Sequence, residues 1–536
     1  MTIPCFFSTK NAILLKIMTD TPQTIYRSSF RFLSGTMISR ISGLVRDVVM
    51  AFAFGTESAL AAFMVAFRLA HLARRLFGEG TLQNTFIPHF EKLRTNNSSQ
   101  ASAFFRDLSA SLVLILLVIV GFGIGSSLLL LYSFDWSKNV QQILWLTAWM
   151  LPSLPFICLF GLNAALLGCE KSYFTAGVAP VAFNLVWILA ALFLIPFSNE
   201  TAMLGLSIAV IIGCGAQWAV TLPRTFQIFR HAKLHLFSPD VRRFIKPLLL
   251  ANFGIAASQI NNALDPLFAL FANAEGPAWL WYAIRVQQLP LALFGIALSN
   301  ALLPPLSRAI KNGNLEQFQL FYHSAYKKVM AFSALITMGI IATAPSCINL
   351  LYGHGHFGIE SIEGTSKCLM AYGIGLFPMT YILVNAPILF AFEDYKSPSY
   401  ASLYAMLLSL VLNSVFIFIL KWEATSVAFS TSLAAYFNAF YLSSILTKHC
   451  QVSIEASFFI KTAFISLVAL SATWSLDFLV LGFIPSIQII MSAPLVVSQN
   501  ILNQISIVSI EIITFIATAA FSAYVIQAKE FYNFKN

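Results

Sequence analysis

Six arginines lie within, or at the end of, long apolar stretches of this sequence: Arg40, Arg46, Arg68, Arg74, Arg75 and Arg285. A guanidinium group inside a membrane is costly, so it normally faces a cavity or an oppositely charged partner. Its planar fork also suits bidentate binding of phosphate oxygens. Arginines gathered around one cavity would therefore bind an anionic substrate, and a phosphate group fits them well.

The acidic residues of the same stretches are too few to neutralise these arginines. The candidates are Asp47, Glu79 and Asp265. Arg40 and Asp47 are seven residues apart, which places them about 20° from alignment on one helix face. One interpretation is that each arginine forms a structural ion pair with one of these carboxylates. That interpretation can explain a single arginine, but it leaves the group with excess positive charge, so we favour a basic cavity.

The composition places these residues in a membrane protein. Of the 536 residues, 58% are hydrophobic and only 10% are charged, and the mean hydropathy is +0.78. A soluble domain has about 25% charged residues, so this chain lacks the charge that a water-exposed surface needs. We predict an all-α polytopic membrane protein, because lipid has to replace water around most of the surface.

A spanning helix needs about 20 mostly apolar residues, and about fourteen stretches of the sequence are on that scale. The clearest stretches are uncharged: 108–134, 139–169, 172–199, 201–223, 286–307, 329–359, 368–392, 397–420 and 424–447. The less clean ones are 29–54, 57–78, 247–272, 456–483 and 506–528. Pro152 and Pro155 lie inside the stretch 139–169, so we expect a kinked helix there.

The distribution of lysine and arginine predicts the orientation. With the N-terminus in the cytoplasm and the helices alternating, 25 of the 32 Lys and Arg residues fall at cytoplasmic loops and termini, against three in external loops. This agrees with the positive-inside rule, and it accounts for the net charge of +10 without a nucleic-acid partner. We therefore predict that both termini and the loop 224–246 are cytoplasmic, and that the loop 353–366 is external.

An internal repeat relates the two halves of the chain. Segment 61–69 resembles 278–286, and segment 77–88 resembles 294–305, both at an offset of 217 residues. Six predicted helices separate the copies, so both copies cross the membrane in the same direction, which predicts two pseudo-symmetric six-helix lobes facing a central site. The predicted parts are a cytoplasmic N-terminal extension, an N-lobe, a C-lobe, and helices 13–14 with a short cytoplasmic tail: 1–27, 28–236, 237–450 and 451–536.

Little in the sequence points to an enzyme or to a metal centre. The seven cysteines show no CxxC or disulfide spacing, and the sequence has no P-loop, glycine-rich nucleotide motif or nucleophile triad. His354 and His356 have no evident third ligand. Asp477 and Glu511, in the last two predicted helices, have no clear partner. We expect no catalytic site and no cofactor.

Four segments carry a family resemblance: SGTMISRISGLVRDVVMAFAFG at 34–55, AAFMVAFRLAHLARRLFGEGTLQNTFIPHFEKLR at 61–94, WYAIRVQQLPLALFGIALSNALLPPLSR at 281–308 and LYGHGHF at 351–357. They resemble the MurJ (MviN) family of lipid II flippases, in the multidrug/oligosaccharidyl-lipid/polysaccharide exporter superfamily. The resemblance implies alternating access that carries undecaprenyl-pyrophosphate-linked disaccharide-pentapeptide from the inner to the outer leaflet of the bacterial plasma membrane. It also implies contacts with membrane lipids and with other cell-wall synthesis proteins.

The same resemblance implies roles for individual residues. It assigns the substrate-binding arginines to Arg40, Arg46, Arg74 and Arg285, with Arg68 and Arg75 beside them, and gating or structural polar roles to Asp47 and Glu79. Some family members bind sodium at positions that match Asp265, Asn413 and Thr431 here, so the resemblance implies coupling to sodium or to the membrane potential. The chain departs from the family's acidic positions at Ala61, Ile284 and Gln288. These departures make the cavity more positive, which suits a pyrophosphate.

Two alternatives belong to different classes of protein. A drug or cation exporter of the same superfamily, or an exporter of another polyprenyl-linked oligosaccharide, would share the fold, but a cation exporter favours acidic cavity residues. A membrane-embedded polyprenyl glycosyltransferase would need paired acidic residues near the cytoplasmic surface, and none cluster there in this sequence.

Overall fold

The structure is a computed structural model, and it describes residues 22–72, 74, 81–170, 172–229, 234–292, 306, 308–310, 315–394, 396–449, 456–491 and 495–528. Every regular element in this described part is a helix. The prediction of an all-α fold is therefore confirmed. Arg75 and Glu79, from the predicted site, lie outside the described residues, as does the whole repeat segment 294–305.

The first half of the chain forms these helices: α1 (Pro22–Phe54), α2 (Ser58–Ala70), α4 (Thr81–Asn96), α5 (Ser98–Ser133), α6 (Lys138–Met150), η2 (Leu151–Ser153), α7 (Leu154–Cys169), α8 (Tyr173–Val178), α9 (Pro180–Leu194) and α10 (Asn199–Phe229). The expected kink in 139–169 is present as the 3-10 turn η2, which separates α6 from α7. Pro152 lies in this turn and Pro155 in the first turn of α7, where a missing N–H donor is tolerated.

The second half forms α11 (Pro239–Ala272), α12 (Gly276–Pro290), α14 (Leu315–Tyr352), α15 (Ile359–Ile374), α16 (Leu376–Ala391), α17 (Lys396–Ser414), η4 (Val415–Ile419) and α18 (Thr425–His449). The chain then continues through α19 (Ala456–Leu481), α20 (Pro485–Ile490) and α21 (Ile501–Val525). A spanning helix was expected at 286–307, but the described helix α12 begins ten residues earlier, at Gly276.

The helix order repeats at nearly the interval that the sequence motifs share. Helix α1 ends at residue 54 and α11 at residue 272, a separation of 218, close to the 217-residue offset of the motifs. Helix α5 ends at residue 133 and α14 at residue 352, a separation of 219. Two helices of the first half are therefore followed at about this interval by helices of similar length in the second half.

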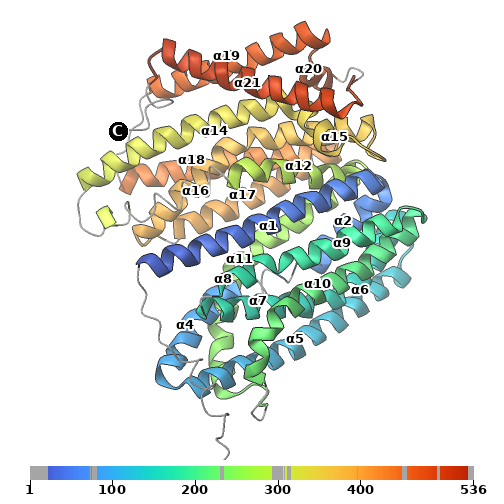
Figure 1. Cartoon of the computed structure of the whole chain (residues 1–536), viewed down its shortest axis with the longest axis vertical. Coiled ribbons are helices and arrows are strands. Elements are labelled where there is room, and N and C mark those ends of the chain that lie inside the picture. The colour runs from blue at the N-terminus through green and yellow to red at the C-terminus, as the bar shows by residue number, and fades with distance from the viewer. Residues whose placement is uncertain are drawn as a thin grey trace, which may run out of the picture.

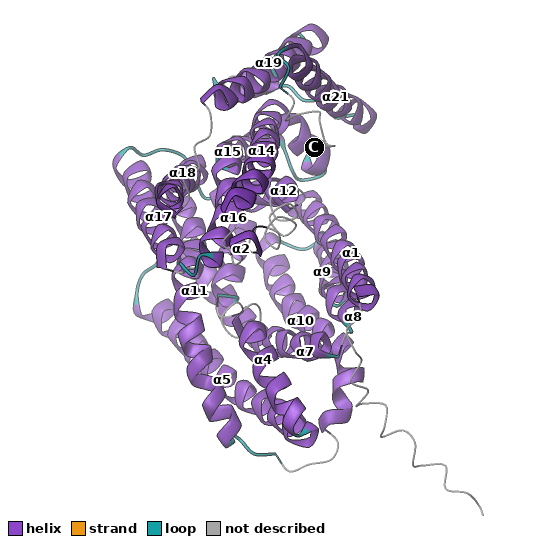
Figure 2. Ribbon diagram, turned by 90° about the vertical axis from the view of Figure 1, so that its left-hand side faces the viewer, coloured by secondary structure: helices purple, strands orange, loops and turns teal. Residues whose placement is uncertain are grey.

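Helix α1 runs between two groups of helices (Figure 1). Helices α4 to α10 gather on one side of α1, which packs directly on α8 and α9. Helices α12 and α14 to α18 lie on the other side, and α19 and α21 pack together against the outer surface of α14. Helix α11 contacts α4 and α5 of the first group and α12 and α17 of the second, and Figure 2 shows it running between α5 and α17.

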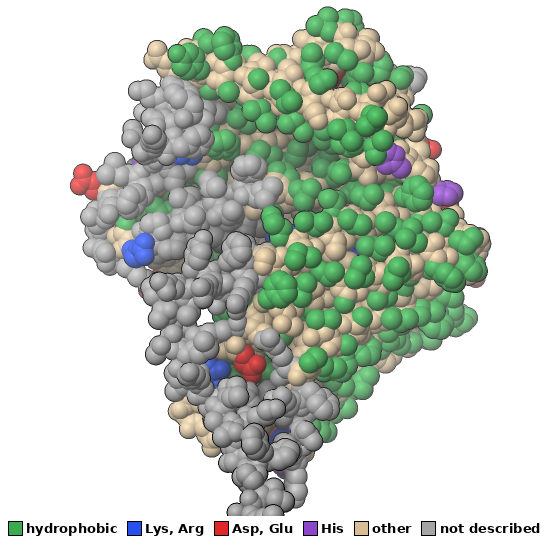
Figure 3. Space-filling model, in the orientation of Figure 1, with side chains coloured by type: hydrophobic (Ala, Val, Ile, Leu, Met, Phe, Trp, Pro, Cys, Tyr) green, Lys and Arg blue, Asp and Glu red, His purple; other side chains and the backbone are tan. Residues whose placement is uncertain are grey.

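Long apolar helices and an apolar surface make this a polytopic membrane protein. Eight spans in the described part are long and apolar enough to cross a membrane, or nine if α15 and α16, bent by 42°, form one span. Large hydrophobic side chains such as Phe122, Leu479 and Ile513 point outward. Figure 3 shows a described surface dominated by such side chains, with few charged ones. The exact count of fourteen helices stays a prediction.

Candidate functional site

Asp47 of α1 contacts two arginines from different parts of the chain. Its Oδ1 accepts hydrogen bonds from Arg46 Nε at 3.1 Å and from Arg46 Nη2 at 2.8 Å. Its Oδ2 lies 3.3 Å from Nε of Arg285 on α12, an ion pair without hydrogen-bond geometry. Asp47 is buried, whereas the Arg285 side chain is 35% exposed. One carboxylate therefore joins α1 to α12 and is shared by two guanidinium groups.

Arg46 contacts side chains of α1 and α9, both from the first half of the chain. Its Nη1 donates to Asn184 Oδ1 of α9 at 3.1 Å, and its Cζ lies 4.8 Å from the centroid of the Trp187 ring. The amide nitrogen of Asn184 in turn donates to Ser42 Oγ at 2.8 Å. With only 7% of its surface exposed, Arg46 is a buried member of a polar network.

The two arginines related by the repeat meet at the same aromatic ring. Arg68 of α2 and Arg285 of α12 are 217 residues apart, and their Cζ atoms lie 5.7 Å and 4.5 Å from the centroid of the Trp281 ring. Phe67 packs edge-on against the same ring, with 5.8 Å between the centroids. The junction of α1, α2 and α12 therefore brings together Arg46, Arg68 and Arg285.

The remaining predicted arginines lie farther along the same elements. Arg40 is exposed on α1, and no ion pair joins it to Asp47, although helix spacing suggested a shared face. Arg74 is half-buried just after α2, where its backbone N–H donates to the carbonyl of His71 at 3.0 Å. The structure thus concentrates three of the six predicted arginines at one junction.

Two of the three predicted sodium ligands are in contact. Asn413 Nδ2 of α17 donates to Asp265 Oδ1 of α11 at 3.3 Å, and both side chains are buried. Asn413 Oδ1 has no hydrogen-bond partner in the described part of the chain, so an unpartnered acceptor oxygen lies near the carboxylate of Asp265. The Thr431 hydroxyl instead donates to the carbonyl of Val427 on its own helix at 3.0 Å. Arg68 is close enough for its charge to act on Asp265.

The two groups of helices touch at the end of α1, where the loop after α14 docks. The backbone N–H of His356 donates to the carbonyl of Phe52 at 3.0 Å. The Thr56 and Ser361 hydroxyls are 2.7 Å apart, and Trp279 Nε1 donates to Thr56 Oγ1 at 3.3 Å. Sequence reasoning did not predict this contact.

Glycines make the close approach at this end possible. A Cβ on Gly55, whose φ is 57°, would lie 2.4 Å from the carbonyl oxygen of His356. A Cβ on Gly355, with a φ of 63°, would lie 2.4 Å from the carbonyl oxygen of Phe52. Each glycine therefore faces the backbone of the other segment, and this pairing is the signal that sequence reasoning overlooked.

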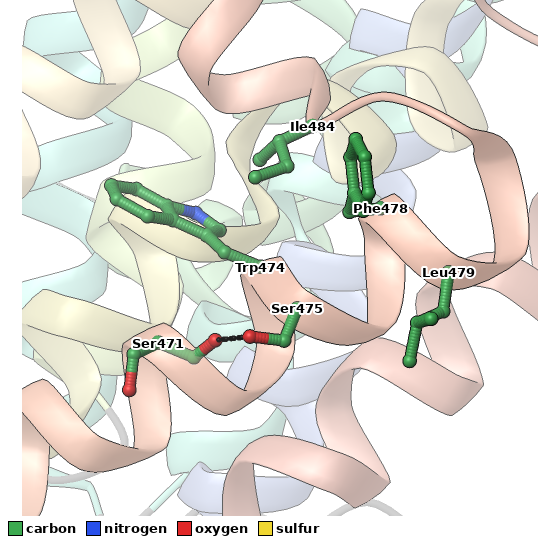
Figure 4. A pocket seen from close by; sticks show the side chains of 6 residues that line it. All are labelled: Ser471, Trp474, Ser475, Phe478, Leu479 and Ile484. Atoms are coloured by element: carbon green, nitrogen blue, oxygen red, sulfur yellow. Dashed lines mark hydrogen bonds between the residues drawn. The ribbon is translucent and has the colours of Figure 1, made fainter.

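A groove of about 490 Å³ lies away from the arginines, on α19. It is lined by Ser471, Trp474, Ser475, Phe478, Leu479 and Ile484 (Figure 4). Ser475 uses its hydroxyl within the helix, donating to the carbonyl of Ser471 at 2.8 Å, so the groove offers mainly apolar surface. Such a groove suits a hydrocarbon chain better than a charged group.

The fold is that of a class of polytopic transporters. A solved structure titled lipid II flippase MurJ, inward closed conformation, matches with a TM-score of 0.75 at 23% identity, covering 92% of this chain and 99% of that one. An inward-facing multidrug resistance MATE family transporter of the MOP superfamily matches with a TM-score of 0.60 at 12% identity, covering 79% and 99%.

The sequence comparisons identify the family within this class. The sequence model described as Lipid II flippase MurJ matches residues 50–505. A relative in Chlamydia muridarum, named probable lipid II flippase MurJ, is 32% identical over 423 residues, which cover 78% of this chain and 77% of the relative. The chain belongs to the MurJ family, a family of lipid transporters rather than enzymes.

Proposed function

We propose that this chain moves lipid II, the polyprenyl-pyrophosphate-linked peptidoglycan precursor, from the inner to the outer leaflet of the bacterial plasma membrane. Membership of the MurJ family supports the substrate. The observation that carries the binding mode is the pair of guanidinium groups, Arg46 and Arg285, that share the single carboxylate of Asp47. This group has a net positive charge at the junction of α1, α2 and α12, and an anionic headgroup is the complementary ligand.

Arg46 and Arg285 have different roles in the proposed binding of a pyrophosphate. Arg285 is partly exposed and makes one ion pair, so its guanidinium fork can turn to phosphate oxygens. Arg46 is buried and fully engaged, so it keeps Asp47 neutralised when Arg285 turns away. Arg68, stacked on the same Trp281 ring as Arg285, adds a second guanidinium near the substrate.

Transport requires the two lobes, 28–236 and 237–450, to open alternately on either side of this site. The contact of Thr56 with Ser361 and Trp279 closes one end in the present structure. With both termini in the cytoplasm, this end is the external one, so the substrate enters from the cytoplasmic side. The apolar groove on α19 is suited to the polyprenyl tail, which would stay in lipid while the headgroup crosses.

The ion at Asp265 and Asn413, or the membrane potential, would drive the cycle. Moving one charge across the membrane releases about 2.3 kcal/mol per 100 mV, so either source is sufficient to bias a conformational equilibrium. The family resemblance extends the proposal to contacts with other proteins of cell-wall synthesis, which cross-linking in growing cells would test.

Complementation tests the function directly. The chain is expressed in bacteria depleted of their own lipid II flippase, and lipid II in the outer leaflet is measured by its accessibility to an enzyme added outside the cells. We expect growth and exposed lipid II to return together. A chain that inserts into the membrane at normal level, yet leaves lipid II inaccessible, would contradict the proposal.

A further inference from the structure

Asp477 of α19 and Glu511 of α21 form a buried carboxyl pair far along the chain from the arginine junction. The two residues are 3% and 1% exposed, and they lie close enough for the charge of Asp477 to act on Glu511. Ser346 Oγ of α14 donates to Glu511 Oε1 at 2.5 Å. Asp477 Oδ2 and Glu511 Oε2 have no hydrogen-bond partner among the described residues. Ionising both groups would place two negative charges side by side with almost no solvent, which favours a proton shared between them.

Among the described residues, no basic side chain forms an ion pair with either carboxyl group. Helix α14 contributes one further titratable group next to the pair, the thiol of Cys347, which contacts the Thr343 hydroxyl at 3.5 Å. Helices α19 and α21 contribute the two carboxyl groups themselves. Two carboxylates close together in apolar surroundings are strongly disfavoured when both are ionised, so their charge has to be balanced by a bound proton or another cation.

A cavity of about 240 Å³ lies beside Ser346, and its wall also includes Asn349, Ser498 and Gln504. Asn349 Nδ2 and Gln504 Nε2 both donate to the carbonyl of Ser498, at 3.0 Å and 2.8 Å. Their amide oxygens are left without a partner among the described residues, although both side chains are at least nine-tenths buried. The cavity thus presents unpartnered acceptor oxygens. Water or another hydrogen-bond donor can satisfy them.

Ser346 connects the cavity to the carboxyl pair, because it lines the cavity and donates a hydrogen bond to Glu511. A water molecule occupies about 30 Å³ of liquid, so the cavity has room for a short chain of waters that would reach Ser346. Asn349 and Ser498 place the cavity near the end of α14, next to the loop that the charge distribution predicts to be external.

We propose that Asp477, Glu511 and Ser346 form a proton-binding site that exchanges its proton with water in this cavity. The neutral pair carries two protons and releases one to cavity water, and the remaining proton stays shared between the two carboxyl groups. A divalent metal fits poorly, because no cluster of three or more His, Cys, Asp or Glu side chains occurs within the described ranges. The site uses none of the arginines that are proposed to bind lipid II.

A lipid-soluble carbodiimide tests the site in the purified wild-type protein, reconstituted in lipid without substrate. This reagent adds to a protonated carboxyl group in apolar surroundings, and mass spectrometry locates the adduct. We expect labelling of Asp477 or Glu511 that decreases as the pH rises and is unchanged when sodium chloride replaces choline chloride. The exposed carboxylate of Glu360 serves as an internal control that should remain unlabelled.

Infrared spectroscopy gives a second readout that does not depend on access of the reagent. The wild-type protein should show a carbonyl band of protonated carboxyl groups that titrates with pH, and the D477N/E511Q variant should lack it, whereas E360Q should keep it. Protection from labelling by sodium at constant pH would overturn the proton site in favour of a sodium site. A wild-type protein with neither the adduct nor the band at any pH would overturn the proposal altogether. Neither readout involves lipid II, so failure here leaves the flippase proposal intact.

Discussion

Arg46→Ala removes the guanidinium group with the most hydrogen bonds at the arginine junction. It deletes two hydrogen bonds to Asp47 and one to Asn184, together with the contact to the Trp187 ring. Asp47 would remain buried next to the resulting gap with only the partly exposed Arg285 as its ion-pair partner, and breaking a buried charge pair costs about 3–5 kcal/mol. We therefore expect Arg46→Ala to lower the stability of the protein by about that amount and to reduce its level in the membrane.

Arg285→Ala should behave differently, although Arg285 contacts the same carboxylate. Its side chain is 35% exposed and makes one ion pair of 3.3 Å to Asp47, which Arg46 continues to neutralise. A pair of this kind contributes about 0–1 kcal/mol to stability. A charge-assisted hydrogen bond to pyrophosphate is worth about 1.5–3 kcal/mol, so losing one weakens substrate binding about tenfold or more. Arg285→Lys keeps the charge without the planar fork and should be only partly active.

Two measurements separate these effects. Denaturant unfolding of the purified protein, followed by tryptophan fluorescence, reports stability, and growth of a flippase-depleted strain at matched expression reports transport. Arg242→Ala, an exposed arginine on α11, is the matched control and should change neither. Growth of the Arg285→Ala strain at the wild-type rate would refute the substrate role of Arg285. An Arg46→Ala protein as stable as the wild type would refute the buried-network interpretation.

Three further predictions concern the closed end, the ion and the topology. In a cysteine-free background, a disulfide between cysteines replacing Thr56 and Ser361, whose hydroxyls are 2.7 Å apart, should stop lipid II export until a reductant is added; export by the oxidised protein would show that this contact need not open. Asp265→Asn should abolish any stimulation by sodium while lipid II binding by the purified protein is retained, because Asp265 contacts Asn413 and lies outside the Asp47 pair; unchanged sodium stimulation would exclude this ion site. A cysteine replacing His235 should react with an impermeant thiol reagent only after the cells are opened, and labelling of intact cells would reverse the predicted orientation.

The sequence predicted well those features that depend on local chemistry. Pro152 cannot donate a backbone hydrogen bond, and the helix is interrupted there by a 3-10 turn. The start of the stretch expected at 286–307 was misplaced for a related reason, and residues 293–305 of it lie outside the described residues. Hydropathy selected the uncharged residues 286–307 because Arg285 interrupts the apolar stretch, yet α12 begins at Gly276, with Pro277 in its first turn. Pro277 marks a helix start, and it was a better guide than the absence of charge.

The arrangement of the predicted site was harder to predict from the sequence, because it depends on which helices contact each other. Spacing on one helix suggested that Arg40 and Asp47 share a face, but it carried no information about α9 or α12. Asn184 and Trp187 reach Arg46 from a segment 138 or more residues away. Their side chains decide that Arg46 is buried while Arg40 is exposed, and neither has a local feature that identifies it as an arginine partner.

In the proposed binding mode, the shared carboxylate would link substrate binding to movement of the lobes. Arg285 holds α12 to α1 through Asp47 in the structure, so the contact is part of what keeps these helices together. A pyrophosphate bound in this way would compete with Asp47 for the guanidinium group of Arg285, and it would therefore weaken a contact between the lobes. Arg46 lowers the free-energy cost of this exchange. Its two hydrogen bonds to Asp47 prevent the carboxylate from becoming an unpaired buried charge. Two arginines on one aspartate are thus better suited to a moving interface than two separate ion pairs, in which each substrate contact would leave one carboxylate uncompensated.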